Sequence, residues 1–188
     1  MFSKILSLLL LTTSVHSYGS GAPARCHICT GMKPGHGRFQ SKPSGSLEIT
    51  GDATLLENES AGGPKKFEIK IETPAEQFMG FLVQIRNKET NKPIGEIHTN
   101  QAYPQAAWGK AKYRYLNCGQ CYPEVSGTDQ GISPGSGALT HANPMFKSSL
   151  DFEWHNIFNF TGTAEVRATI LKSYTNFWQN VKIFEFEV

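Results

Sequence analysis

Apolar and polar residues alternate with a period of two in several segments of the chain, which is typical of β-strands that bury one face. The clearest example is residues 66–72, in which every second residue is Phe or Ile. Similar alternation occupies residues 150–154, 164–170 and 184–188. These segments predict strands that pack one face on a common core.

One apolar segment departs from simple alternation. Phe81, Val83 and Ile85 alternate in the same way. Leu82, however, adds an apolar side chain on the opposite face. The pattern predicts a strand that is either covered on both sides or placed near a sheet edge. A shorter strand is expected at residues 113–115.

Turn-forming residues separate these segments, at 62–64, at 87–93 and through the long Gly- and Pro-rich stretch 123–144. Helical periodicity is nearly absent. Residues 173–180 are the one exception, and there a turn of helix and a loop are equally compatible with the sequence. Many short strands without βαβ alternation, repeats or linkers predict an all-β, antiparallel β-sandwich in a single domain.

Residues 1–17 have the features of a secretory signal peptide. One base, Lys4, precedes an apolar run at 5–11, and the segment ends in Val-His-Ser, whose small residues suit a signal-peptidase site. The run is too short for the roughly 20 apolar residues that cross a bilayer. We therefore expect cleavage after Ser17, secretion of residues 18–188 as one domain, and no membrane anchor.

Charge and motifs narrow the function classes. The secreted part would carry 17 Lys and Arg, one fewer than the whole chain, against 16 Asp and Glu, a net charge of +1. This balance indicates no nucleic-acid partner. The chain has no GxSxG, HExxH or GxxxxGK[ST] motif, and no two of its later histidines have i, i+4 spacing. We expect no catalytic residues, no cofactor and no metal site.

Four cysteines form two CxxC pairs, Cys26 with Cys29 and Cys118 with Cys121. In a cytosolic protein this spacing would indicate a tetrahedral zinc site. An oxidising secretory route instead favours disulfides, and the even number leaves no unpaired thiol. Bridges from the first pair to the second would close loops of roughly 90 residues and constrain the unfolded chain by about 4–5 kcal/mol. Two such bridges are favoured, in either of the two connectivities that join the pairs.

The first pair also has the form of a thiol-oxidoreductase motif, because a histidine inside CxxC can stabilise a thiolate. That motif needs a strand before it and a helix that begins at the first cysteine. Here Gly- and Pro-rich residues 19–23 precede the pair and residues 31–35 follow it. We expect neither that local structure nor redox activity.

Several motifs stand in order along the chain: Cys29-Thr30-Gly31-Met32, Pro34-Gly35-His36-Gly37, Gln40, residues 78–86 (FMGFLVQIR), residues 93–97 (PIGEI), Leu116-Asn117-Cys118, Thr140-His141, residues 150–154, residues 162–169 and Phe177-Trp178. In this order, across nearly the whole secreted part, they resemble the reeler domain, a module named for the N-terminal part of reelin. The resemblance implies an immunoglobulin-like or fibronectin-like β-sandwich.

The resemblance also bears on the cysteines. It implies a disulfide between Cys29 and Cys118, and then leaves Cys26 to pair with Cys121, a second bridge beyond the usual family pattern. The chain departs from the family at Gly63, where a Y-x-P-G-like turn is usual, and after Trp154, where the family has a proline.

Short secreted proteins with one reeler domain resemble invertebrate defence proteins that bind microbial surface components and blood cells. The expected function is therefore innate immunity, with lipopolysaccharide, teichoic acid or glucan as partners and antimicrobial activity as a consequence. The alternative is an extracellular-matrix or cell-adhesion module that binds host surfaces without an immune role.

The sequence offers only weak candidates for a ligand site. A cationic strip near the N-terminus would attract anionic phosphates, and its residues are Arg25, Lys33, His36, Arg38 and Lys42. A solvated basic loop is the simpler interpretation of the strip. Trp108, between small residues, is the candidate platform for stacking on a sugar ring, whereas Trp154 and Trp178 are expected in the core. The loop at residues 123–143 is a third candidate.

Two sequons predict N-glycosylation in a secreted chain. They are Asn58-Glu59-Ser60 and Asn159-Phe160-Thr161, and both fall in expected turns.

Overall fold

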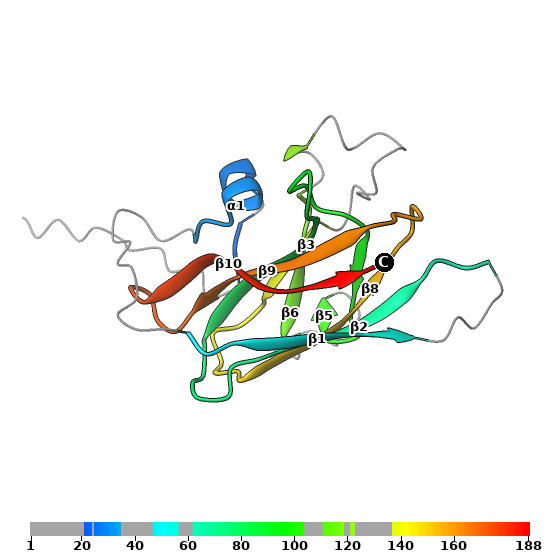
Figure 1. Cartoon of the computed structure of the whole chain (residues 1–188). Coiled ribbons are helices and arrows are strands. Elements are labelled where there is room, and N and C mark those ends of the chain that lie inside the picture. The colour runs from blue at the N-terminus through cyan, green and yellow to red at the C-terminus, as the bar shows by residue number, and fades with distance from the viewer. Residues whose placement is uncertain are drawn as a thin grey trace, which may run out of the picture.

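Two β-sheets face each other in the computed structural model (Figure 1). The structure describes residues 21–23, 25–34, 47–56, 62–103, 111–118, 121–122 and 137–188. One sheet has the strand order β1 (Thr50–Leu56), β2 (Lys66–Glu72), β8 (Ser149–His155) and β4 (Glu96–His98). The other has the order β10 (Phe177–Glu187), β9 (Thr163–Leu171), β3 (Gly80–Asn87), β7 (Ala138–His141), β6 (Tyr113–Leu116) and β5 (Ala102–Tyr103). The predicted all-β sandwich is confirmed. Neighbouring strands are antiparallel except β5 and β6, which are parallel.

The main core lies between the two sheets and is built by the alternation seen in the sequence. In β2 the residues of one phase, Phe67, Ile69 and Ile71, are buried, and their neighbours are exposed or half-buried. Phe67 lies opposite Trp154 in β8, and Ile69 lies opposite Phe152. Apolar residues of the two strands therefore share one face, so the buried faces reinforce each other.

Trp154 is fully buried near the centre of this core. Its indole Nε1 donates a hydrogen bond to the carbonyl of Ile94 at 2.8 Å, and its ring packs against Phe67 and Phe186 at centroid distances of 5.8 and 5.7 Å. The backbone of Gly95 has a φ of 62°, and a Cβ there would collide with the indole. The Pro-x-Gly turn before β4 is thus shaped around the tryptophan.

Strand β3 is covered on both sides, which decides between the two interpretations of its sequence. Phe81 and Val83 face the main core, and Leu82 faces a second cluster of buried residues under the short helix α1 (Cys26–Gly31). Figure 1 shows α1 on the side of the six-stranded sheet that faces away from the other sheet. The second cluster contains Ile28, Cys29, Met32, Leu82, Leu116, Cys118, Tyr122 and Ala138.

Residues 173–180 do not form a helical turn. Bends occupy 172–175, and β10 begins at Phe177. The pairing of β10 with β9 shifts register twice, and Asn180 at the first shift has a φ of 52°. These irregularities break the period of two, which explains why the sequence pattern was ambiguous there.

Two expectations concern residues that the structure does not describe: the signal peptide at 1–17, and all but the end of the stretch 123–144. Within the described ranges, none of the helices is long and apolar enough to cross a membrane.

Candidate functional site

Two disulfides join α1 to the segment that follows β6. Cys26 bonds to Cys121 and Cys29 bonds to Cys118, with Cα–Cα distances of 5.0 and 5.5 Å. This is the pairing implied by the resemblance, together with the bridge that it left over. The helix itself was not expected from the flanking glycines and prolines. It forms because one helical turn places both cysteines of a CxxC on the same face, where each reaches its partner.

The carbonyl groups at the end of α1, residues 29–32, all accept hydrogen bonds from outside the helix. Arg86 Nη2 donates to the first two, both at 3.2 Å. Tyr122 also donates to the first, at 3.1 Å. Gln179 donates to the third at 3.0 Å, and the hydroxyl of Thr169 donates to the fourth at 2.6 Å. Since helix ends leave carbonyls without partners, these donors fix α1 on the outer face of the six-stranded sheet.

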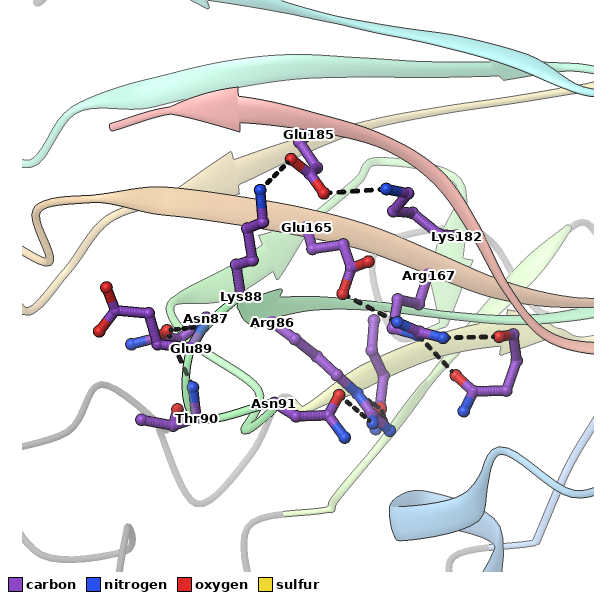
Figure 2. A network of polar contacts seen from close by, with 12 residues as sticks. Arg86, Asn87, Lys88, Glu89, Thr90, Asn91, Glu165, Arg167, Lys182 and Glu185 are labelled. Carbon is purple, nitrogen blue, oxygen red and sulfur yellow. Dashed lines mark hydrogen bonds and ion pairs between the residues drawn. The ribbon is translucent and has the colours of Figure 1, made fainter.

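Arg86 is the centre of this anchor and is only 1% exposed. Its Nε donates to Gln84 Oε1 at 2.9 Å, and its Nη1 donates to Asn91 Oδ1 at 3.0 Å, a contact drawn in Figure 2. Burial lowers the pKa of Arg86 below its ordinary value. The guanidinium is bonded by neutral oxygens and lies beneath α1, so its role is to hold the helix rather than to meet a ligand.

A second polar cluster lies on β9 and β10 (Figure 2). Arg167 pairs with Glu165 at 2.9 Å and donates to both the side chain and the carbonyl of Asn180, at 2.8 and 2.9 Å. Arg167 thereby closes the irregular part of β10. Lys88 and Glu185 pair at 2.7 Å on the surface. Solvent and salt screen such an exposed pair, so it contributes little to stability.

The predicted ligand residues fall into two groups. Arg25 precedes α1, Lys33 follows it, and both are exposed. Six residues of helix separate them, so their backbones are roughly 10 Å apart along the helix axis. His36, Arg38, Lys42 and Trp108 lie outside the described residues. The structure therefore places two cations of the predicted strip at the two ends of an anchored helix.

Sequence reasoning missed a groove of about 500 Å³ beside the four-stranded sheet. Its walls include the carboxylates of Glu68, Asp151 and Glu153, together with Gln101 and Tyr115. Gln101 donates to Asp151 at 3.1 Å. Burial raises the pKa of Tyr115. Residues from β2, β6 and β8 meet here, and no local sequence pattern marks residues so far apart.

A pair of histidines lies at one side of this groove. His98 and His155 stack with ring centroids 4.0 Å apart. Each ring nitrogen Nε2 contacts a carboxylate of its own strand, Glu96 at 3.1 Å and Glu153 at 2.9 Å. Burial lowers the pKa of His155. Across the described ranges, no three His, Cys, Asp or Glu side chains are grouped to hold a metal ion.

The second sequon lies on an exposed turn. Asn159 has a φ of 52° and an exposed side chain. The turn is closed by the buried Asn156, whose side chain exchanges two hydrogen bonds with the main chain of Phe160, both at 2.8 Å. Glycosylation of Asn159 stays a prediction, and Asn58 lies outside the described residues.

Comparison with known proteins places these features in a family. "Putative defense protein 3" of Antheraea mylitta is 25% identical over 178 residues, which cover 95% of this chain and 91% of that protein. "Putative defense protein Hdd11-like" of Samia ricini is 22% identical over 182 residues, or 97% of this chain and 94% of that protein. The crystal structure of the human F-spondin reeler domain superposes with a TM-score of 0.49 at 12% identity, over 80% of this chain and 94% of that one.

The sequence profile of the family described as "Reeler domain" matches residues 27–185. This span begins within α1 and ends within β10, so it contains all the strands from β1 to β9 in full and most of β10. The chain therefore belongs to the reeler domain family.

Proposed function

We propose that this protein is a secreted defence protein that acts by binding microbial surface components, namely lipopolysaccharide, teichoic acid or glucan. The observation that carries the proposal is the pair of relatives named as defence proteins, which align with 95% and 97% of the chain. The alignment covers the whole sandwich rather than one motif. The signal-peptide pattern and the paired cysteines support an extracellular setting.

The α1 surface supplies a contact for the anionic ligands of this group. Arg25 and Lys33 carry exposed positive charges at the two ends of the helix. Two disulfides and the hydrogen bonds to carbonyls 29–32 hold that helix in place. Fixed cations bind phosphate with less loss of conformational entropy than cations on a free loop, so the anchoring favours binding.

The test is a pull-down of the pure secreted chain with lipopolysaccharide, teichoic acid and β-glucan at about 0.15 M salt. We expect an Arg25→Gln/Lys33→Gln variant to bind the two anionic ligands about tenfold more weakly, because two exposed charge contacts are lost. Binding to the uncharged glucan should not change.

A control variant, Lys65→Gln/Lys70→Gln, removes the same charge from exposed positions at the four-stranded sheet and should bind as the parent does. Failure of the parent chain to bind any of the three ligands would refute the proposal. Binding to collagen, proteoglycan or host cells alone would favour the adhesion alternative instead.

A further inference from the structure

The connection between β7 and β8 presents two adjacent large apolar side chains to solvent. Met145 is 70% exposed and Phe146 is 65% exposed. Single exposed apolar residues are ordinary on protein surfaces. Two neighbours at the outermost part of one connection form an apolar tip, which we define as Met145 and Phe146.

The tip is held in a fixed shape by the residues around it. The ammonium group of Lys147 donates to the carbonyls of Asn143, Met145 and Met79, at 3.1, 2.6 and 3.3 Å. The main chain of Met145 donates to Asn143 Oδ1 at 3.2 Å. Lys147 and Phe78 exchange two main-chain hydrogen bonds, at 2.8 and 2.9 Å. The exposure of the tip is therefore built into the fold, because both sides of the connection are tied to the sheet.

Positive charges surround the base of the tip. Lys112 is exposed, and its carbonyl accepts a hydrogen bond from Ala142 at 2.9 Å. Burial and the nearby Lys112 lower the pKa of Lys147 to about 8, so this group also keeps its charge at neutral pH. Lys172 follows Leu171, whose carbonyl accepts a hydrogen bond at 2.8 Å from the amide of Met79, the same residue whose carbonyl Lys147 contacts. Lys172 pairs with Glu76 at 2.8 Å. A second carboxylate, exposed Glu72, lies opposite Ser149 at this end. The charges described here are therefore three lysines, Lys112, Lys147 and Lys172, against the carboxylates of Glu72 and Glu76.

We infer that this end of the molecule docks on an anionic lipid surface, with the tip inserted among the lipids and Lys112 at the headgroup phosphates. Two side chains are far too few for a stable protein interface, which buries roughly 800 Å² on each partner. A fluid lipid layer accepts a small protruding apolar tip, and neighbouring cations supply the second signal that weak insertion requires.

This inference does not depend on the function proposed above. The tip lies beside the first residues of β3, whereas Arg86, which anchors α1, lies near the other end of that strand. Six residues of strand separate the two places by roughly 20 Å.

The test measures partition of the secreted chain onto sedimented vesicles, either phosphatidylcholine alone or phosphatidylcholine with phosphatidylglycerol. We expect binding to the anionic vesicles and little binding to the neutral ones. The variant Met145→Ser/Phe146→Ser should bind about tenfold more weakly or worse. Lys112→Gln should weaken binding about fivefold.

The matched control is Leu55→Ser, which removes another apolar side chain, 57% exposed on β1, and should bind as the parent does. Near-ultraviolet circular dichroism establishes that each variant is folded. Equal binding of the tip variant and the parent would overturn the inference, as would absence of parent binding to anionic vesicles or equal binding to neutral ones. The Arg25→Gln/Lys33→Gln variant should still bind vesicles, which separates this outcome from failure at the α1 surface.

Discussion

Replacing Arg86 by Met tests whether this buried cation anchors α1. The methionine keeps an unbranched apolar side chain in the space but removes every donor. The buried Oε1 of Gln84 and the partly buried carbonyl of Thr30 would lose their bond to the guanidinium, whereas Cys29 keeps the bond from Tyr122. Each buried acceptor left unpaired costs about 1–3 kcal/mol. The expected loss in the free energy of unfolding is therefore about 3 kcal/mol.

The assay is equilibrium unfolding in urea with both disulfides intact, so that the bridges contribute equally to parent and variant. Hydrogen exchange should also quicken at the amides of Ile28 and Cys29, which bond to the carbonyl of Arg25 in the first turn of α1. The disulfides would still tether the helix. We therefore expect local loosening together with the global loss.

Two further variants serve as controls for Arg86→Met. Arg25→Met removes an exposed arginine at the other end of α1 and should change stability by less than about 0.5 kcal/mol. Arg86→Lys keeps a charge but lacks the planar fork, so it should recover only part of the loss. If Arg86→Met unfolds within about 0.5 kcal/mol of the parent, the anchoring role is wrong.

Three other outcomes follow from the same structure. Cys29→Ser/Cys118→Ser should lower the urea midpoint more than loss of the other, more exposed bridge, because both of these sulfurs are fully buried. Thermal stability should fall as pH drops below about 6.5, because the unfolded chain binds a proton at His155 more readily than the folded chain, in which the pKa of His155 is lowered. In the variant His155→Gln, the melting temperature should change less between about pH 7.5 and 5. Asn156→Ala should cost about 2 kcal/mol in urea unfolding, because it removes both hydrogen bonds to Phe160 that close the turn.

The strands that were predicted best are those with one face on the main core. In β2 and β8 the apolar residues alternate without interruption, and both strands appear where the pattern predicted them. Strand β1 was missed because its sequence, TGDATLL, alternates poorly and includes a glycine. It forms because all seven of its residues pair with β2, and that support comes from the neighbouring strand rather than from its own side chains.

The candidate sites were harder to predict, for a different physical reason. Arg86 looks like an ordinary charged residue at the end of a strand, and its acceptors at residues 29 and 30 lie 57 and 56 positions away in sequence. The groove beside the four-stranded sheet likewise combines residues of several strands. The cysteines were informative because disulfide chemistry restricts their partners to other cysteines. A guanidinium can bond any carbonyl, so the sequence does not identify its partner.

The two surfaces proposed for binding share a design that separates stability from recognition. At α1, the buried groups Arg86 and Thr169 hold the backbone, and the exposed charges of Arg25 and Lys33 lie at its two ends. At the tip, Lys147 holds the connection while Met145 and Phe146 point outward. In both places the cost of ordering the backbone is met during folding, so a ligand gains affinity without having to order it again. Exposed residues at either surface can therefore be substituted with little effect on stability, so the same fold could bind different ligands.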